Sequence, residues 1–182
     1  ADMAGVERRL AKTIGLGVMY GMGYNKMAKE LDIEPAEAKN MLADFRNKVP
    51  FMQGMLEAVM NRASSKGVIR TLLGRKCRFD LWEPKQWGVH KALPINQAGT
   101  YKALNRLIQG SAADQTKKAM VDVYNELNII PLIQVHDELD CSVAGEEQAK
   151  KVKEVMENCV ELEVPSKVDI DLGDNWGQWQ QK

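Results

Sequence analysis

The spacing of hydrophobic residues predicts five helical segments along the chain. Apolar positions three and four residues apart form one face of a helix, and such a face packs against a core. The expected helices lie at residues 5–31, with an interruption at "YGMGYNK", and at 34–48, 51–66, 99–127 and 145–161. The apolar faces expected in the third and fourth are Phe51, Met55, Leu56, Val59 and Met60, and Leu104, Leu107, Ile108, Ala112, Met120 and Val123.

Alternation of apolar and polar residues predicts strands elsewhere. Residues 67–80 alternate around Gly74, which indicates a hairpin, and "SKVDIDLGDNW" at 166–176 is expected to form a final strand. Residues 81–99 read as a loop. With a further strand segment at 131–143, the expected fold is α+β: a helical block, then an antiparallel sheet backed by helices.

The segment "PLIQVHDELDCSV", residues 131–143, has the composition of a buried strand except at its centre. There His136, Asp137 and Glu138 stand side by side, and burying an unpaired charge costs several kcal/mol. A tight turn at His136 and Asp137 removes the conflict, because it makes a hairpin of two arms. On the second arm we expect Leu139, Cys141 and Val143 to point inward, and Asp140 and Ser142 to point outward.

The two carboxylates at the expected turn suit a hard cation. Mg²⁺ prefers oxygen ligands and typically takes one or two carboxylates together with substrate phosphates. Asp137 and Glu138 are therefore candidate metal ligands. Adjacent acids at an exposed turn are also common without any metal, and this alternative stays open.

A second candidate site lies in "ERRLAKTIGLGVMYGMG", residues 7–23. Four side chains recur every four residues on one stripe of the helix: Arg8, Lys12, Leu16 and Tyr20. Two cations, an apolar contact and an aromatic ring could read the phosphates, the sugar and the base of a nucleotide. The alternative is an ordinary amphipathic helix, in which Gly15 and Gly17 are unusual because each costs about 1 kcal/mol against Ala. Their presence indicates that something approaches closely.

A third candidate lies in "ALNRLIQGSAAD", residues 103–114. Asn105 and Gln109 are one helical turn apart, and small residues follow them. Paired amides could hydrogen-bond base edges in a minor groove, where every base pair offers acceptors. Tight helix packing explains the small residues equally well.

Composition fits a globular protein and adds one asymmetry of charge. The 182 residues are 45% hydrophobic and 27% charged, and we find neither a membrane-spanning run nor a signal-peptide pattern. The scattered Cys77, Cys141 and Cys159 suggest reduced thiols in a cytoplasmic compartment. Net charge is zero, but residues 61–78 contain six Lys or Arg and no acid. That stretch is either a phosphate-facing surface or a solvated basic loop.

Together the three stretches resemble the family A, DNA polymerase I type, polymerases. "RRLAKTIGLGVMYGMG" is similar to the motif of the fingers helix, and "IQGSAAD" to the palm helix that carries the family's Gln. "QVHDEL" resembles the palm hairpin motif nearly letter for letter, while "LLGRK" and "GDNWGQW" also fit the family's order and spacing. The likeness covers essentially the whole chain.

The resemblance implies a role for each candidate residue. Asp137 would be a catalytic Mg²⁺ ligand, Glu138 a supporting acid and metal ligand, and His136 a contact to the primer strand. Arg8 and Lys12 would hold the triphosphate of the incoming dNTP, with Lys12 also a candidate proton donor to the leaving pyrophosphate.

Further implied roles concern the sugar, the insertion site and the duplex. Tyr20 would stack beside the insertion site, and Asn105 and Gln109 would touch template and primer. The family usually has Phe or Tyr where this chain has Leu16, which faces the nucleotide sugar. The hydroxyl of the Tyr variant can stand in for a missing 3′-hydroxyl of the nucleotide.

One family motif, Asp-Tyr-Ser-x-x-Glu, does not occur in the sequence. It supplies the family's second metal-binding Asp, so the two-Mg²⁺ site is expected to be incomplete in this chain. The family's thumb and exonuclease stretches are not found either. We therefore expect a C-terminal polymerase part, split or trimmed, with fingers helices and the return to the palm at 1–66 and a C-terminal palm subdomain at 67–182.

The leading hypothesis is thus a DNA polymerase part in the cytoplasm of a bacterial or phage-infected cell. It would bind dNTP and primer–template DNA and would be inactive without a second polypeptide that carries the missing motif and thumb. Self-association through an unpaired palm edge is also expected. The alternatives are a non-catalytic nucleotide- or nucleic-acid-binding module, which does not need the carboxylate of Asp137, and a small Mg²⁺-dependent hydrolase.

Overall fold

The computed structural model describes residues 8–84, 95–175 and 180–181. The chain forms two compact units, residues 1–108 and 109–182, and the boundary between them falls within one long helix, α5. The predicted α+β class is confirmed, because helices and antiparallel strand pairs make up both units. The predicted division into fingers and palm at residue 66 is a different partition and stays a prediction. No helix in these ranges is long and apolar enough to cross a membrane.

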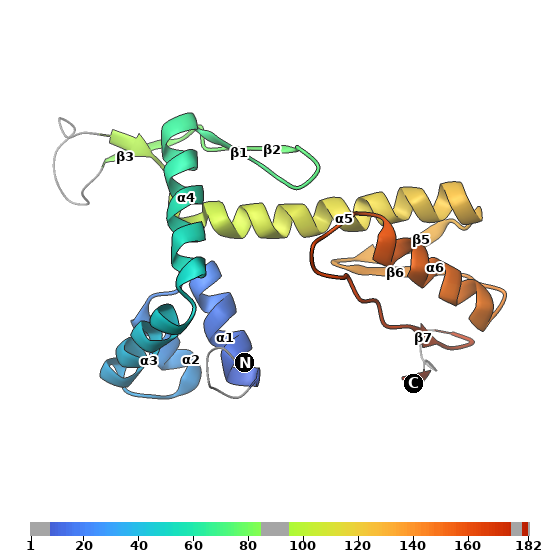
Figure 1. Ribbon diagram of the computed structural model, residues 1–182, viewed down its shortest axis with the longest axis horizontal. Coiled ribbons are helices and arrows are strands. Elements are labelled where there is room, and N and C mark those ends of the chain that lie inside the picture. The colour runs from blue at the N-terminus through green and yellow to red at the C-terminus, as the bar shows by residue number, and fades with distance from the viewer. Residues whose placement is uncertain (1–7, 85–94, 176–179, 182) are drawn as a thin grey trace. The chain divides into compact units, whose positions relative to one another are not determined.

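Four helices form the first part of unit 1 (Figure 1). They are α1 (Arg8–Met19), α2 (Tyr24–Leu31), α3 (Pro35–Lys48) and α4 (Pro50–Lys66). The expected interruption is confirmed by the turn between α1 and α2, and a proline begins both α3 and α4, where the missing N–H is not needed. The buried side chains of this helical block are Ile14, Val18, Met27, Ala28, Ala38, Leu42, Phe45 and Val49.

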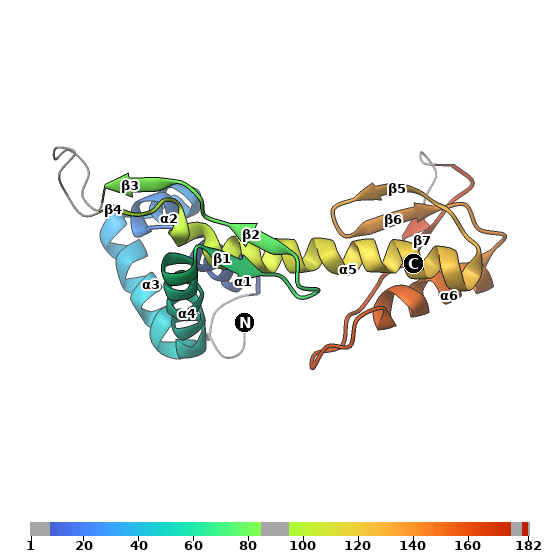
Figure 2. The same cartoon turned by 90° about the horizontal axis from the view of Figure 1, so that it is seen from above.

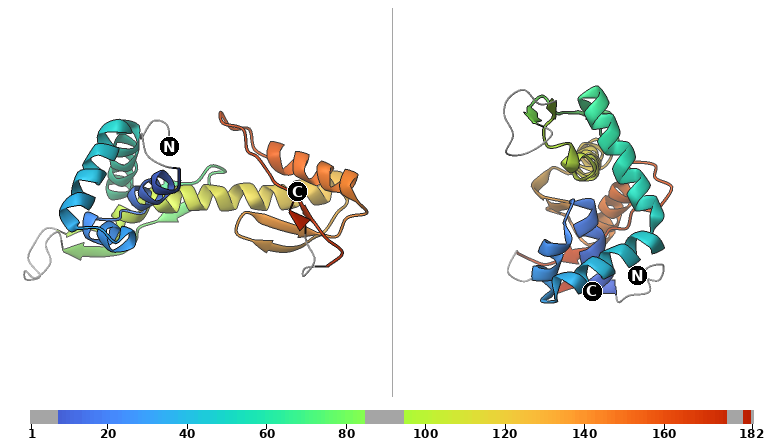
Figure 3. Two further views of the ribbon diagram at one scale, coloured as in Figure 1. Left: turned by 90° about the horizontal axis from the view of Figure 1, so that it is seen from below. Right: turned by 90° about the vertical axis from the view of Figure 1, so that its left-hand side faces the viewer.

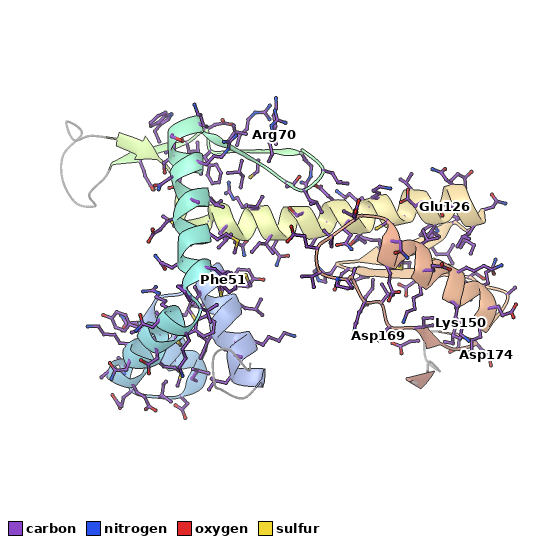
Figure 4. The ribbon with its side chains drawn as sticks, in the orientation of Figure 1. Phe51, Arg70, Glu126, Lys150, Asp169 and Asp174 are labelled. Carbon is purple, nitrogen blue, oxygen red and sulfur yellow. The ribbon has the colours of Figure 1, made fainter. Side chains whose placement is uncertain are left out.

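The apolar face of α4 is buried only toward the end of the helix. Ala63 lies in a second core with Ile69, Phe79 and Ala103, and Val59 packs against it. Phe51, near the start of the helix, is 60% exposed and projects from the ribbon (Figure 4). Residue spacing correctly indicated the helix but not which part of its apolar face has a partner.

Two strand pairs complete unit 1 (Figure 2). The predicted hairpin around Gly74 is confirmed: β1 (Val68–Arg70) pairs antiparallel with β2 (Lys76–Arg78). The loop expected at 81–99 is wrong at both ends, because β3 (Trp82–Pro84) pairs with β4 (Ile95–Gln97). Strands of three residues are too short to show a period of two. Residues 85–94 lie outside the described ranges.

Gly67 joins α4 to β1 in the left-handed region, with φ of +66°. A Cβ placed on this residue would lie 2.5 Å from Nε2 of Gln97. The junction therefore favours glycine for its backbone conformation, while a larger residue would also displace the end of the Gln97 side chain.

A short 3-10 turn, η1 (Thr100–Lys102), leads into α5 (Ala103–Leu127), most of which, from Gln109 onward, belongs to unit 2. The hairpin of β5 (Pro131–Val135) and β6 (Glu138–Cys141) and the helix α6 (Glu146–Asn158) flank the C-terminal part of α5 (Figure 3). The core between them contains Val123, Ile129 and Val152, with Cys141 and Val143 packed against it. The inward direction predicted for Cys141 and Val143 is thereby confirmed, and Ser142 is exposed as expected, whereas Asp140, which was predicted to point outward, is half-buried.

The last strand is shorter than predicted. Only Asp171–Leu172 forms β7, which pairs with β8 (Gln180–Gln181). Residues 166–170 extend without strand pairing, and Gln115 Nε2 donates to Ser166 Oγ at 3.0 Å. The expected single sheet is thus replaced, within the described residues, by four separate two-stranded pairs.

Candidate functional site

The β5–β6 hairpin turns at the two residues that the sequence predicted. Val135 pairs with Glu138, which leaves His136 and Asp137 as the two-residue turn. His136 has φ of +53°, and a positive φ at the first turn residue suits the twist of a tight hairpin. Gln134 Nε2 donates to the carbonyl oxygen of His136 at 2.6 Å and holds the turn in place.

The turn presents its charged side chains to solvent. His136, Asp137 and Glu138 are all exposed. Exposed carboxylate oxygens on adjacent residues fit a Mg²⁺ ion that takes one or two protein ligands and completes its shell with water and phosphate. In the part of the chain that the structure describes, no group of three or more His, Cys, Asp or Glu could hold a metal by itself. The turn therefore fits the metal as a partial site.

Behind the turn, the hairpin is anchored by a half-buried thiol. Burial, with a smaller contribution from the carboxylate of Asp140, raises the pKa of Cys141. Cys141 therefore remains a neutral thiol at physiological pH and packs as a small hydrophobic residue.

In unit 1, α1 arranges the second set of predicted residues along its outer side. Lys12 is exposed, Leu16 is half-buried and Tyr20 is 42% exposed just past the end of the helix. The opposite side carries Ile14 and Val18, which are buried in the helical core. The predicted stripe is thus formed from Lys12 to Tyr20. Arg8 begins the helix, and its side chain lies outside the described part.

Packing inside unit 1 accounts for one of the two glycines of α1. A Cβ on Gly17 would lie 3.1 Å from the Met22 side chain, whereas one on Gly15 would lie 3.7 Å from Cζ of Phe45, which is an ordinary van der Waals contact. The close approach predicted at Gly17 is therefore made by Met22, from the turn that follows the helix.

The third set lies one turn apart in α5. Asn105 is half-buried and Gln109 is exposed. Of the small residues that follow, Ala112 is exposed and the others are half-buried, so none of Gly110–Ala113 reaches the buried cores of the described residues. The side of α5 that carries Gln109 and Ala112 is therefore accessible to a ligand.

Sequence reasoning missed the neighbour of Asn105. The guanidinium of Arg106 lies 4.9 Å from the ring centre of Phe79, and its Nη1 lies 4.0 Å from Sγ of Cys77. The buried ring fixes the long side chain by a cation–π contact. No local pattern reveals this pairing, because the partners come from different elements.

The predicted residues thus fall into separate sets. Lys12, Leu16, Tyr20 and Asn105 belong to unit 1, and Gln109 and the hairpin residues belong to unit 2. The structure brings His136, Asp137 and Glu138 together at one turn, and it places Lys12, Leu16 and Tyr20 on one side of α1.

The sequence profile of DNA polymerase family A matches residues 1–178. The chain belongs to DNA polymerase family A. Within the family, the DNA-directed DNA polymerase of Pseudomonas phage M6 is 38% identical over 97% of this chain and 30% of its own length. The thermostable DNA polymerase I of Thermus aquaticus is 33% identical over 93% of this chain and 20% of its own length.

A solved family A structure has a similar fold. The POL domain of Pol1 from M. smegmatis, in complex with DNA primer-template and dNTP, superposes with a TM-score of 0.71 and 32% sequence identity. The match covers 87% of this chain and 28% of that chain. This chain therefore spans only about 20–30% of the length of the family A proteins it matches.

Proposed function

We propose that this chain is the C-terminal catalytic part of a DNA-directed DNA polymerase. It binds primer–template DNA and an incoming dNTP, and it supplies Asp137 to a Mg²⁺-dependent nucleotidyl transfer. The observation that carries the proposal is the exposed pair of carboxylates at the β5–β6 turn in a chain that belongs to family A.

The hairpin would hold the metal. Asp137 and Glu138 are the residues that offer oxygen ligands there, and bound Mg²⁺ would neutralise charge on the phosphates. His136, at the same turn, would contact the primer strand. The short turn fixes the backbone of these three residues relative to the two strands, and phosphoryl transfer depends chiefly on positioning.

The outer side of α1 would bind the nucleotide. Arg8 and Lys12 would hold the triphosphate, and Lys12 would also protonate the departing pyrophosphate. Leu16 would lie against the sugar and Tyr20 beside the insertion site. Support comes from the exposure of Lys12 and Tyr20 on one side of a helix whose other side is buried.

The face of α5 would contact the duplex. Asn105 and Gln109 would donate to acceptors in the minor groove, which are present at every base pair. Their partial or full exposure and the small residues beside them leave room for a duplex.

A second polypeptide segment would complete the metal site. Two cations about 4 Å apart repel each other and need carboxylates that face both of them. Asp137 and Glu138 come from one turn, so the facing acid would come from a segment with the Asp-Tyr-Ser-x-x-Glu motif.

The test is reconstitution. Residues 1–182 are mixed with a polypeptide that carries this motif and a thumb, and Mg²⁺-dependent primer extension is measured. We expect extension with both polypeptides and none with either alone. Robust extension by residues 1–182 alone would contradict the incomplete site, and DNA binding without extension in any mixture would favour the non-catalytic binding module.

A further inference from the structure

One face of the β1–β2 hairpin consists almost entirely of cations. Val68 pairs with Arg78, and Arg70 pairs with Lys76. Residues directly opposite each other in an antiparallel pair share a face, so these four side chains lie on one side of the hairpin. Ile69 and its partner Cys77 occupy the other side, where Ile69 is buried in the core of unit 1. The cationic face therefore points away from the core, as Arg70 does in Figure 4.

The positive charge on this face includes two cations that stand directly opposite each other. Arg70 stands directly opposite Lys76, and like charges in that arrangement destabilise a strand pair. Arg70 Nη1 donates to the carbonyl oxygen of Gly74 at 3.0 Å, which is a neutral partner. Among the described residues, Lys76 and Arg78 form no ion pair, and residues 61–78 contain no acid.

We propose that this cationic face of Arg70, Lys76 and Arg78 binds the sugar–phosphate backbone of DNA. The choice of DNA as the polyanion rests on the proposed polymerase function. Lys76 and Arg78 are alternate residues of β2, so they lie about 7 Å apart along the strand, with Arg70 beside Lys76. A line of cations fits a chain of phosphates better than it fits one phosphate group. Neutralising the Arg70–Lys76 repulsion would favour binding further.

The first test is the salt dependence of DNA binding without dNTP or Mg²⁺. Binding of purified residues 1–182 to a labelled duplex of about 20 base pairs is followed by fluorescence anisotropy over a series of NaCl concentrations. Each phosphate contact contributes about 0.9 to the slope of log affinity against log salt. We expect the double substitution Lys76→Gln and Arg78→Gln to reduce that slope by about 1 to 2.

A matched control removes the same charge elsewhere in unit 1. Lys29 and Lys39 are exposed on α2 and α3, and Lys29→Gln with Lys39→Gln should leave the slope as in the unsubstituted chain. Equal slopes for the two double variants would overturn the proposal, and so would a failure of the unsubstituted chain to bind DNA. If the hairpin substitutions weaken binding to phosphatidylserine vesicles but leave the DNA slope unchanged, the face binds lipid and the proposal is wrong.

A second variant separates binding from stability. Lys76→Glu places an acid opposite Arg70, so the isolated protein should melt at a higher temperature while its DNA affinity falls by about tenfold or more. A higher melting temperature with unchanged DNA affinity would contradict the proposal. Neither measurement requires nucleotide addition. Failure of the proposed catalysis and failure of this inference are therefore distinguishable.

Discussion

The turn of the β5–β6 hairpin concentrates charge and backbone constraint in three residues. His136 has a positive φ, which is uncommon outside glycine but enriched in His, Asn and Asp. The neighbouring carboxylates of Asp137 and Glu138 are both exposed, so packing in a core does not explain their position. Their exposure leaves them accessible to a ligand from solvent.

Substitution of Asp137 tests that interpretation. Asp137→Asn keeps the size of the side chain and removes its charge, so primer extension by the reconstituted enzyme should be abolished while the circular dichroism spectrum is unchanged. Asp140→Asn on the same hairpin is the matched control and should extend primers normally. Extension by the Asp137 variant within about tenfold of the unsubstituted enzyme, or 1.4 kcal/mol in the barrier, would refute the metal-ligand role.

Leu16 provides a prediction about the sugar of the nucleotide. Its side chain cannot donate a hydrogen bond, so a terminator that lacks the 3′-hydroxyl leaves neighbouring polar groups unpaired, at a cost of about 1–3 kcal/mol. Leu16→Tyr should therefore increase the use of terminators relative to normal nucleotides. Competition between the two nucleotides in one primer-extension reaction measures the ratio, and an unchanged ratio would mean that the sugar is recognised elsewhere.

At the scale of elements, unit 2 depends on how α5, α6 and the hairpin share a core. Val123 of α5 is fully buried between Ile129 and Val152. Val121, two residues earlier, is exposed on the same helix. α5 therefore contains one buried and one exposed valine only two residues apart.

Substituting each valine in turn measures how much the core of unit 2 contributes to the free energy of unfolding. Val123→Ala should lower the free energy of unfolding by about 2 kcal/mol, because two methyl groups are lost and a cavity remains. Val121→Ala should change it by less than about 0.5 kcal/mol. Urea unfolding followed by circular dichroism tests both, and equal effects would show that α5 packs differently.

Helices and turns were predictable where the sequence contained a physical conflict or an apolar repeat that continued over many residues. The turn at His136 and Asp137 followed from the cost of burying charges, and the helices followed from long apolar repeats. The three-residue strands of β3 and β4 are too short to show a period. The Arg106–Phe79 contact depends on how α5 and the residues that follow β2 are brought together, and local sequence contains no information about that.

At the scale of the whole molecule, the order of helical and strand segments was enough to predict the α+β class. The unit boundary was not predictable, since it falls inside α5, where a continuous helix shows no change in composition. The roles proposed for the site residues rest on motif resemblance and on the family match.

The exposed apolar residues of β5 predict self-association of the isolated chain. Leu132 is 66% exposed, and Ile133 and Val135 are also exposed on this two-stranded hairpin. Such a strand offers apolar surface to another molecule and, among the described residues, an edge without a paired strand. Sedimentation velocity should show a mass that rises with concentration.

The strand itself can be tested with one added charge. Leu132→Lys should shift the chain toward monomer, whereas Ser142→Lys, which adds the same charge to the exposed end of the other arm, should have little effect. A concentration-independent monomer for the unsubstituted chain would contradict this prediction.

Gly67 has a consequence for how this sequence can vary. Its positive φ penalises any side chain, so Gly67→Ala should destabilise unit 1 by about 1–2 kcal/mol and β-branched residues should cost more. In a library of all single substitutions selected for polymerase activity, this position should be depleted as strongly as a catalytic one. A parallel selection for folded protein alone would deplete Gly67 and spare Asp137, so the two screens together would separate residues kept for shape from residues kept for chemistry.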